Sequence, residues 1–473
     1  MPAFSIENLG CRATDADAAA MRESLVERGF SLATADAPAD VVVLNTCTVT
    51  ASADAQSREA VRKIHRSNPL AKIIVTGCYA QRAPEELASL EGVAAVVGNA
   101  HQSEIAEIAS AADAAPRVSQ SLISAAALQA DAMSLARGPA KILTSDIFDQ
   151  ADIQLARGNS LAADRTRPIL KIQDGCNNRC SYCVIPSVRG RSRSLAPRRV
   201  IEEVERLVSA GAREIVLSGI NLGSYGRDLS PRASLAEICE RILSETQLEQ
   251  LRFSSIESQD VTADFAAFAA SSPRVAPHFH VPLQSGSDRI LRAMHRRYRA
   301  AHYAARIETL HRLLPNAAIG ADVIAGFPGE AREDFQATAD FIRALPLSYL
   351  HVFSFSTRPG TKAEDMTGAV PPQEIRERAR LLRALSQEKS SAFRRSQAGR
   401  TMRALTLHRR GNGWTEALTG NYLRIRATGD FSANTWLDLW VTQTLEELAE
   451  QVNSPLASGD ARSPAPAETP AYS

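Results

Sequence analysis

The chain has 473 residues, enough for two to four domains that each bury a core, and 44% hydrophobic with 23% charged residues is ordinary for a globular protein. No apolar run approaches the roughly 20 residues of a membrane span, and the amino-terminal residues lack a secretory pattern, so we expect no membrane partner. The odd count of seven cysteines in a long chain of net charge +1 argues against disulfide scaffolding and favours a reducing cytoplasm.

Residues 1–112 alternate strand and helix patterns. The expected strands are 4–9, 40–45, 72–76 and 94–97, and the expected helices cover 15–29 and 53–67 and begin again at Pro84. This alternation predicts a doubly wound α/β domain with a parallel sheet. Residues 113–160, rich in Ala, Ser and Gln, are expected to be a linker with some helix.

Three cysteines of this first domain stand in the same place relative to three strands. Cys11, Cys47 and Cys78 each lie one to three residues past an expected strand end. The carboxyl ends of parallel strands face one crevice, so the three thiols could reach one small object there. The alternative is three separately buried cysteines, which are common as small hydrophobic residues.

A second alternation, over residues 161–392, predicts a different α/β architecture. Its expected strands are 169–173, 214–219, 251–255, 278–283, 319–326 and 349–355, with helical patterns between them. Six such units predict a partial (β/α)6 barrel whose functional residues collect at the carboxyl ends of the strands. Cys239 falls in a helical pattern and is expected to be a core thiol.

The loop after the first barrel strand carries Cys176, Cys180 and Cys183 in the run Cys-Asn-Asn-Arg-Cys-Ser-Tyr-Cys. Three thiolates can hold three irons of a cubane 4Fe–4S cluster and leave the fourth iron open to a small molecule. The alternatives are chance or a zinc site, but a zinc site needs a second pair of ligands and none follows closely.

The last part of the chain is basic and rich in short strands. Residues 371–410 contain eleven Lys or Arg against three Asp or Glu, and 371–398 is expected to be a long basic helix. Expected strands at 402–407, 414–419, 423–427 and 435–441 predict a small OB-like β-barrel, within a module at 393–452, whose core would explain Trp414, Trp436 and Trp440. Residues 453–473 are expected to be a disordered tail.

The spacing of Cys176, Cys180 and Cys183 resembles that of the radical S-adenosylmethionine (SAM) superfamily, in which the open iron chelates SAM and electron transfer cleaves it. In this resemblance Tyr182 is the aromatic residue beside the adenine of SAM. The barrel segments 214–228, 280–288 and 322–330 resemble corresponding segments of the methylthiotransferase family, which implies SAM binding by Ser218, Glu257 and Gln284.

Residues 1–100 and 166–430 resemble the radical SAM methylthiotransferases in one domain order. The contexts of Cys47 and Cys78 carry the resemblance, which implies a second 4Fe–4S cluster on Cys11, Cys47 and Cys78 that bears the inserted sulfur. The run 419–425 resembles the RNA-binding TRAM domain. The run Thr48-Val-Thr50 resembles the branch that acts on N6-threonylcarbamoyladenosine in tRNA.

The resemblance implies methylthiolation of carbon 2 of this base at position 37, beside the anticodon, with SAM used twice. It implies tRNA as a partner, a flavodoxin- or ferredoxin-like electron donor, and a sulfur source that the sequence does not identify. Two rivals remain: an isopentenyladenosine enzyme, and a non-catalytic iron–sulfur protein that binds RNA. The residues expected to hold RNA are basic or aromatic, namely Arg189, Arg191, Arg193, Arg394, Arg395, Arg409, Arg410 and Tyr422.

Overall fold

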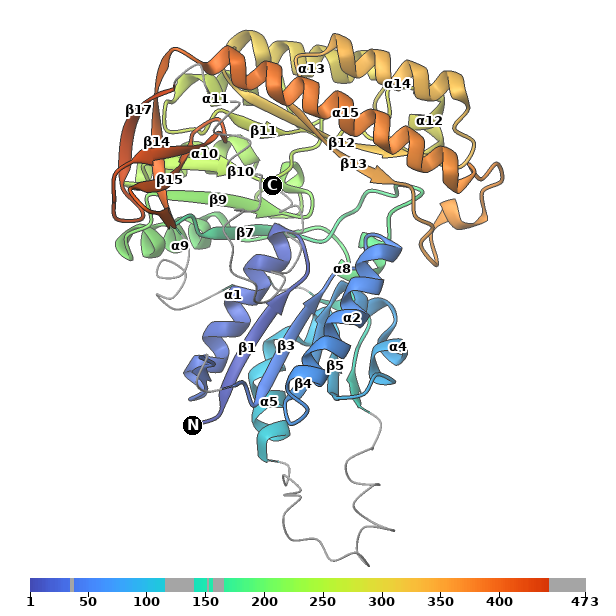
Figure 1. The fold of residues 1–473 in the computed structure, drawn as a ribbon, viewed down its shortest axis with the longest axis vertical. Coiled ribbons are helices and arrows are strands. Elements are labelled where there is room, and N and C mark those ends of the chain that lie inside the picture. Colours follow the sequence, from blue (N-terminus) through green and yellow to red (C-terminus); the bar gives the residue numbers. More distant parts are fainter. Residues whose placement is uncertain (35–37, 115–139, 151–152, 156–165, 442–473) are drawn as a thin grey trace, which may run out of the picture. The chain divides into compact units, whose positions relative to one another are not determined.

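The computed structural model describes residues 1–34, 38–114, 140–150, 153–155 and 166–441 (Figure 1). The predicted disordered tail, the end of the predicted C-terminal module and most of the predicted linker lie outside these residues. The chain divides into two compact units. Unit 1 comprises Met1–Gly158, Gly175–Asn177 and Cys183–Arg191, and unit 2 comprises Asn159–Asp174, Asn178–Tyr182 and Ser192–Ser473. No helix among the described residues is long and apolar enough to cross a membrane.

Unit 1 is built on one parallel sheet with the strand order β2-β1-β3-β4-β5-β6. Its strands are β1 (Ala3–Asn8), β2 (Ser31–Leu32), β3 (Val41–Thr46), β4 (Lys72–Gly77), β5 (Val93–Val97) and β6 (Lys141–Leu143). Its helices are α1 (Arg12–Glu27), α2 (Ala51–Ser67), α3 (Cys78–Arg82), α4 (Pro84–Ala88), α5 (Ile105–Ala114) and α8 (Ile185–Arg189), with short 3-10 turns η1 (Asn99–Glu104) and η2 (Ile147–Asp149).

Alternate side chains of these strands enter two separate cores. Val41 and Val43 of β3 pack with residues of α1 and α5, whereas Val42 and Leu44 pack with residues of α2, α3 and α4. A strand buried on both faces must be apolar throughout, as the run 41–44 is. The doubly wound prediction for this domain is confirmed.

Two strands of this sheet were absent from the sequence prediction. The two residues of β2 are too few to show a pattern. The strand β6 pairs with β5 and lies in the segment predicted to be linker, so the sheet extends past residue 112. Two of its three residues are exposed, so the strand has no buried apolar run, and only Leu143 packs against the core.

Unit 2 contains a parallel, partly closed barrel. Its strands are β7 (Ile169–Asp174), β8 (Arg193–Ser194), β9 (Glu214–Gly219), β10 (Gln250–Phe253), β11 (His278–His280), β12 (Ala318–Ala325) and β13 (Tyr349–Ser354). The orders β10-β9-β7-β8 and β11-β12-β13 are joined by bridges between residues of β10 and β11 segments, such as Ser255 with His280. Six parallel strands in the order β7-β9-β10-β11-β12-β13 confirm the predicted (β/α)6 arrangement.

Helices follow the barrel strands in alternation: α9 (Pro197–Ser209), α10 (Leu235–Glu245), α11 (Ala263–Ser271), α12 (Asp288–Ala293), α13 (Ala300–Leu313), α14 (Arg332–Ala344) and α15 (Pro372–Gln397), with the turns η3 (Leu222–Ser224) and η4 (Lys362–Asp365). In α9 the buried residues Val200, Val204 and Leu207 recur at helical spacing and make one apolar face. Cys239 is fully buried in α10, as predicted for a core thiol.

The C-terminal sheet is antiparallel, with the order β16-β15-β14-β17. Its strands are β14 (Arg400–Gly411), β15 (Trp414–Thr419), β16 (Arg424–Thr428) and β17 (Trp436–Val441). Because α15 continues to Gln397, the module begins at about residue 400 rather than 393. The prediction that all three tryptophans are core residues was wrong, since Trp440 is 65% exposed.

A buried arginine joins the C-terminal sheet to the barrel. Arg252 of β10 pairs with the Glu214 carboxylate at 2.6 Å and donates to the carbonyl oxygens of Gly420 at 2.9 Å and Thr419 at 3.3 Å. Both charged side chains are fully buried. Burial raises the pKa of Glu214, but Arg252 and Arg167 more than offset it and hold the pKa below its ordinary value.

Tyr422 closes the amino-terminal end of the barrel. Its ring stacks on His278, the first residue of β11, with centroids 4.4 Å apart, and the Arg252 guanidinium lies 5.2 Å from the ring centre. The backbone of Tyr422 has a φ of 70°, which is uncommon for a residue with a side chain. The stack and the turn hydrogen bond to Thr419 hold this conformation. The ring of Tyr422 therefore takes part in barrel packing, and since Tyr422 is half-buried, its contact with RNA stays a prediction.

We predict that Arg252→Met destabilises unit 2 by at least about 2 kcal/mol, because it leaves Glu214 buried with only Arg167 nearby. Urea unfolding followed by tryptophan fluorescence measures this, since all three tryptophans lie in the C-terminal sheet. The matched control is Arg403→Met. Arg403 pairs with Glu249 at 2.6 Å but is 50% exposed, so its loss should cost less than about 1 kcal/mol. Equal costs for the two variants would contradict the role of Arg252.

Candidate active site: two cysteine sets, each with a buried arginine

Cys11, Cys47 and Cys78 stand at the carboxyl ends of three adjacent strands of unit 1. Cys11 is three residues past β1, while Cys47 and Cys78 directly follow β3 and β4. Since β1, β3 and β4 are neighbours in the sheet, their ends form one edge. The thiols interact electrostatically, because Cys47 is influenced by both Cys78 and Cys11. The structure thus brings the first predicted set together.

Gly77 lets this edge close. Its φ of +96° is a conformation that side chains disfavour, and a Cβ there would lie 2.4 Å from the carbonyl oxygen of Thr46. Any other residue would push the end of β4 away from the end of β3. Gly77 therefore keeps Cys78 and Cys47 within reach of one another.

Burial of these thiols opposes their deprotonation, whereas nearby hydrogen-bond donors and a helix amino-terminus favour it. Burial raises the pKa of Cys47 to about 12 and also raises that of Cys11. Cys11 stands at the N-cap of the 16-residue helix α1, and hydrogen bonds from the backbone of Thr14 and Ala13 lower its pKa. Helix amino-termini and nearby cations favour thiolates, the form that binds metal.

Arg189 supplies the nearby cation. Its Nε donates to Cys78 Sγ at 3.3 Å and its Nη2 contacts the Asp17 carboxylate of α1 at 2.8 Å. The side chains of Arg189 and Asp17 are 2% and 0% exposed. Arg189 was predicted to bind RNA, and this was wrong, because a buried, ion-paired guanidinium cannot reach a phosphate. Arg193 is likewise 8% exposed and lies 3.6 Å from Asp174, which contradicts its RNA-binding prediction.

The second cysteine set lies on the loop that follows β7. The side chains of Cys176, Cys180 and Cys183 are all half-buried. The loop is fixed by backbone hydrogen bonds: Ser181 donates to the carbonyl of Met294, and Ala363 donates to that of Ser181. Tyr182 packs edge-on to Phe327, with centroids 6.4 Å apart, in a small apolar cluster. A short, half-exposed loop with three thiols suits a cluster that must also admit a small ligand.

Arg296 is the counterpart of Arg189 in unit 2. Its Nη1 donates to Cys180 Sγ at 3.3 Å, its Nη2 pairs with Glu257, and its side chain is 4% exposed. Burial lowers the pKa of Arg296, but the Glu257 carboxylate offsets this and holds the pKa well above its ordinary value. Cys180, Glu257, Arg296 and Tyr298 line one small cavity. No sequence pattern identifies Arg296, because it is one of several arginines in the run 292–299.

The predicted SAM-binding residues lie at or just past the carboxyl ends of barrel strands. Ser218 is the fifth residue of β9 and is 1% exposed. Glu257 follows β10 and is engaged by Arg296. Gln284 follows β11 in a left-handed conformation, with φ 68°, and its backbone pairs with that of β12. Backbone strain of this kind is common at ligand sites. SAM binding by these residues stays a prediction.

The run Thr48-Val-Thr50 has structural roles. The Thr48 hydroxyl donates to Asp54 at 2.6 Å and accepts from Arg82 at 2.8 Å, and it is fully buried. Thr50 caps α2 by accepting from the Ala53 backbone at 3.1 Å. These contacts fix the loop that carries Cys47.

The fold and the cysteine loop define a radical SAM enzyme. The family described as the radical SAM superfamily matches residues 170–342, and the one described as uncharacterized protein family UPF0004 matches residues 3–98. A solved structure of the radical SAM methyltransferase TsrM from Kitasatospora setae superposes with a TM-score of 0.52 at 16% identity, covering 77% of this chain and 74% of that one. This likeness concerns the fold.

Sequence relatives narrow the class. The threonylcarbamoyladenosine tRNA methylthiotransferase MtaB of Aquifex aeolicus is 35% identical over 90% of this chain and 96% of its own length. The enzyme of the same name from Bacillus subtilis is 34% identical over 83% and 82%. A tRNA-2-methylthio-N(6)-dimethylallyladenosine synthase of Acidothermus cellulolyticus is 31% identical over 88% and 79%. The chain belongs to the radical SAM tRNA methylthiotransferases, of the MtaB type.

This membership makes the chain a transferase that uses SAM and 4Fe–4S clusters. The donor sets fit such clusters, because each offers three thiols, beside a guanidinium that favours the anionic form. The rival of a non-catalytic RNA-binding protein is thereby set aside.

We predict about eight irons per chain after anaerobic reconstitution, four on each cysteine set. Replacing Cys11, Cys47 and Cys78 together by Ala should leave about four irons, as should replacing Cys176, Cys180 and Cys183. Cys239→Ala is the matched control, because Cys239 is buried in α10, and it should leave the count unchanged. A count of about four in the unaltered chain would exclude two clusters.

We also predict that Arg189→Gln lowers the reduction potential of the cluster on Cys11, Cys47 and Cys78, because a nearby positive charge stabilises the reduced, more negative cluster. Redox titration followed by electron paramagnetic resonance, in a chain lacking the other three cysteines, measures this. Arg189→Lys keeps the charge and should have a potential nearer the wild type. The same potential in all three proteins would show that the charge of Arg189 does not influence the cluster potential.

Proposed function

We propose that this chain adds a methylthio group to carbon 2 of N6-threonylcarbamoyladenosine at position 37 of tRNA. The observation that carries the proposal is the second set of three cysteines, at the sheet edge of unit 1. A radical SAM enzyme needs one three-cysteine cluster to bind SAM. A second set of three cysteines therefore implies a second cluster with a different chemical role. Sulfur insertion is such a task, and the relatives that cover most of this chain are named for it.

In this proposal the two sets divide the work. Cys176, Cys180 and Cys183 hold the cluster that binds SAM, and Cys11, Cys47 and Cys78 hold the cluster that carries sulfur. When bound, the first cluster would supply the electron, SAM the methyl group, and the second cluster the sulfur. Arg296 and Arg189 place a positive charge beside each set and favour the thiolate ligands. A flavodoxin- or ferredoxin-like protein of the cytoplasm would provide the electrons.

The C-terminal sheet offers the face that we propose for RNA. Trp440 is 65% exposed, and the Arg403 and Arg426 guanidinium groups lie 4.3 Å and 4.4 Å from the ring centres of Trp436 and Trp414. Aromatic rings and guanidinium planes stack on unpaired bases, while exposed arginines neutralise phosphates.

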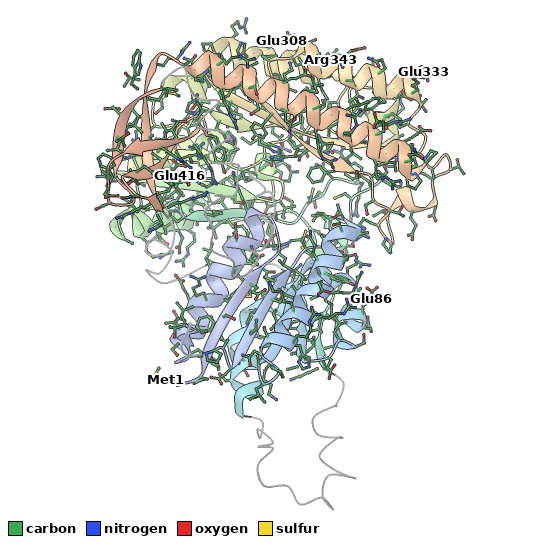
Figure 2. The ribbon with its side chains drawn as sticks, viewed as in Figure 1. Met1, Glu86, Glu308, Glu333, Arg343 and Glu416 are labelled. Carbon is green, nitrogen blue, oxygen red and sulfur yellow. The ribbon has the colours of Figure 1, made fainter. Side chains whose placement is uncertain are left out.

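Of the arginines predicted to bind RNA, Arg191, Arg395, Arg409 and Arg410 are exposed and Arg394 is half-buried, so these five remain in the proposal. Glu416, buried between Arg424 at 3.1 Å and Arg409 at 3.8 Å, orients part of this surface (Figure 2).

The second candidate substrate is dimethylallyladenosine, which the synthase of Acidothermus cellulolyticus carries in its name. The enzymes of Aquifex aeolicus and Bacillus subtilis, named for threonylcarbamoyladenosine, are 35% and 34% identical to this chain, against 31% for that synthase. We therefore favour threonylcarbamoyladenosine.

The function is tested by measuring 5′-deoxyadenosine and methylthiolated product together, with tRNA bearing either base. We expect product with threonylcarbamoylated tRNA. Cys176→Ala should abolish 5′-deoxyadenosine release, whereas Ala at Cys11, Cys47 and Cys78 should leave release intact and stop product formation. Equal loss of 5′-deoxyadenosine in both variants would contradict the division of work, and product with dimethylallyladenosine alone would contradict the substrate.

The RNA face is tested by the salt dependence of tRNA affinity. Arg409→Ala and Arg410→Ala each remove one cation that neutralises a phosphate, so each should reduce the slope of log affinity against log salt by roughly 0.7–0.9. Trp440→Ala should weaken binding without changing the slope, because stacking releases no counterions. Arg343→Ala, an exposed arginine of α14, is the control and should change neither (Figure 2). Unchanged binding in the first three variants would exclude this face.

A further inference from the structure

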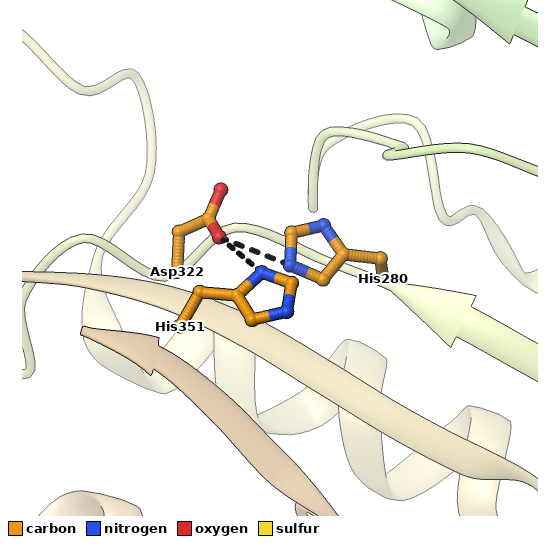
Figure 3. Close-up of side chains that lie close together, drawn as sticks. All are labelled: His280, Asp322 and His351. Atoms are coloured by element: carbon orange, nitrogen blue, oxygen red, sulfur yellow. Dashed lines mark hydrogen bonds and ion pairs between the residues drawn. The ribbon is translucent and has the colours of Figure 1, made fainter. Parts of the chain in front are cut away.

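Three ionisable side chains meet inside the barrel, on its β11, β12 and β13 side. Asp322 Oδ1 lies 3.0 Å from His280 Nε2 and 3.2 Å from His351 Nδ1 (Figure 3). The two imidazole rings are stacked, with centroids 4.9 Å apart. The other nitrogen of His280 is held by the Ser255 hydroxyl at 2.7 Å. We call His280, Asp322 and His351 the polar floor.

The polar floor is sealed on the amino-terminal side of the barrel. Below it, His278 and Tyr349 begin β11 and β13 and are hydrogen-bonded at 2.9 Å. A Cβ at Gly320 would overlap the ring of Tyr349, so that ring fills the space over β12. Tyr422 then covers His278. Yet Asp322 and His351 keep 21% and 23% of their side-chain surface exposed, so the polar floor is not closed on every side.

One carboxylate oxygen of the polar floor, Asp322 Oδ2, could accept a hydrogen bond from a ligand. Both imidazoles contact Oδ1 of Asp322, while the second carboxylate oxygen is directed away from them (Figure 3). Among the described residues, that Oδ2 accepts no hydrogen bond. Burial raises the pKa of Asp322, but His280 and His351 more than offset this and hold the pKa below its ordinary value, so the carboxylate stays charged. A charged oxygen inside a barrel is costly unless a donor reaches it.

We propose that the polar floor is the subsite for the N6 substituent of the target adenine, with Asp322 Oδ2 accepting a hydrogen bond from a urea N–H or the hydroxyl of a threonylcarbamoyl group. The inference rests on the proposed function and extends it to the choice of base. The substituent's own carboxylate is repelled by Asp322, so its donors face the polar floor. A dimethylallyl group has no donor, so it would shield Oδ2 from solvent without giving it a hydrogen-bond partner. A polar site discriminates strongly against a substrate that lacks the matching group.

The test compares Asp322→Asn with wild type, both cluster-loaded and with SAM bound. The probes are anticodon stem-loops carrying threonylcarbamoyladenosine, dimethylallyladenosine or unmodified adenosine. In the Asp322→Asn variant the two imidazoles hold the amide oxygen, so the amide nitrogen replaces Oδ2 and opposes a donor. We expect the preference for the threonylcarbamoylated loop to fall about 10- to 100-fold, with affinity for the unmodified loop and RNA-free 5′-deoxyadenosine release unchanged.

Two further variants make the result decisive. Asp340→Asn removes an exposed carboxylate of α14, 59% exposed, and should leave the preference intact. His351→Phe keeps a ring against His280 but removes the nitrogen that holds Oδ1. It should weaken the preference in part, and it decides the matter if Asp322→Asn loses iron or fold.

Several outcomes would overturn the inference. One is an unchanged preference in both floor variants, and another is an equal loss of affinity for all three loops. A third is a stoichiometric zinc or manganese ion in the holoprotein that Asp322→Asn removes, because the same three side chains could then be metal ligands. Wild-type protein that modifies only the dimethylallyl loop would instead overturn the proposed function.

Discussion

Keeping thiolates wholly or partly out of water is the constraint around which both sites are built. A thiol that must bind metal has to lose its proton, and burial opposes that loss, as the raised pKa of Cys47 shows. In each unit a guanidinium lies 3.3 Å from a cysteine sulfur: Arg189 beside Cys78 and Arg296 beside Cys180. A buried guanidinium needs its own counter-charge.

That counter-charge is present in both units. Arg189 is paired with Asp17 and Arg296 with Glu257, and all four side chains are largely or fully removed from solvent. The same order of cysteine, arginine and carboxylate thus occurs twice, on two unrelated architectures. The recurrence reflects shared electrostatics, because one cysteine set is gathered from three strand ends and the other lies on a single loop.

The sequence allowed the strands and the cysteine positions to be predicted, because these depend on local patterns. The apolar run 41–44 identifies a buried strand, and the next cysteine must stand at its end. The arginines could not be predicted, since Arg189 is 172 residues from Asp17 and 111 from Cys78. Arginine in a basic run looks like a surface charge, which is why Arg189 and Arg193 were assigned to RNA. The short strand β6 could not be predicted either, because two of its three residues are exposed and it pairs with a strand more than 40 residues earlier in the chain.

The C-terminal sheet is tied to the barrel by Tyr422 and Arg252, and this has a consequence for how such enzymes can be recombined. A domain whose side chains close the end of the adjacent barrel cannot be exchanged for another simply by joining the two chains at the linker. A chimera that grafts the C-terminal sheet of a relative onto this barrel would have to bring residues that match His278, Arg252 and Glu214, or the barrel would open at its base. A chimera must therefore preserve this buried interface. Joining the two parts at the end of α15 does not by itself do so.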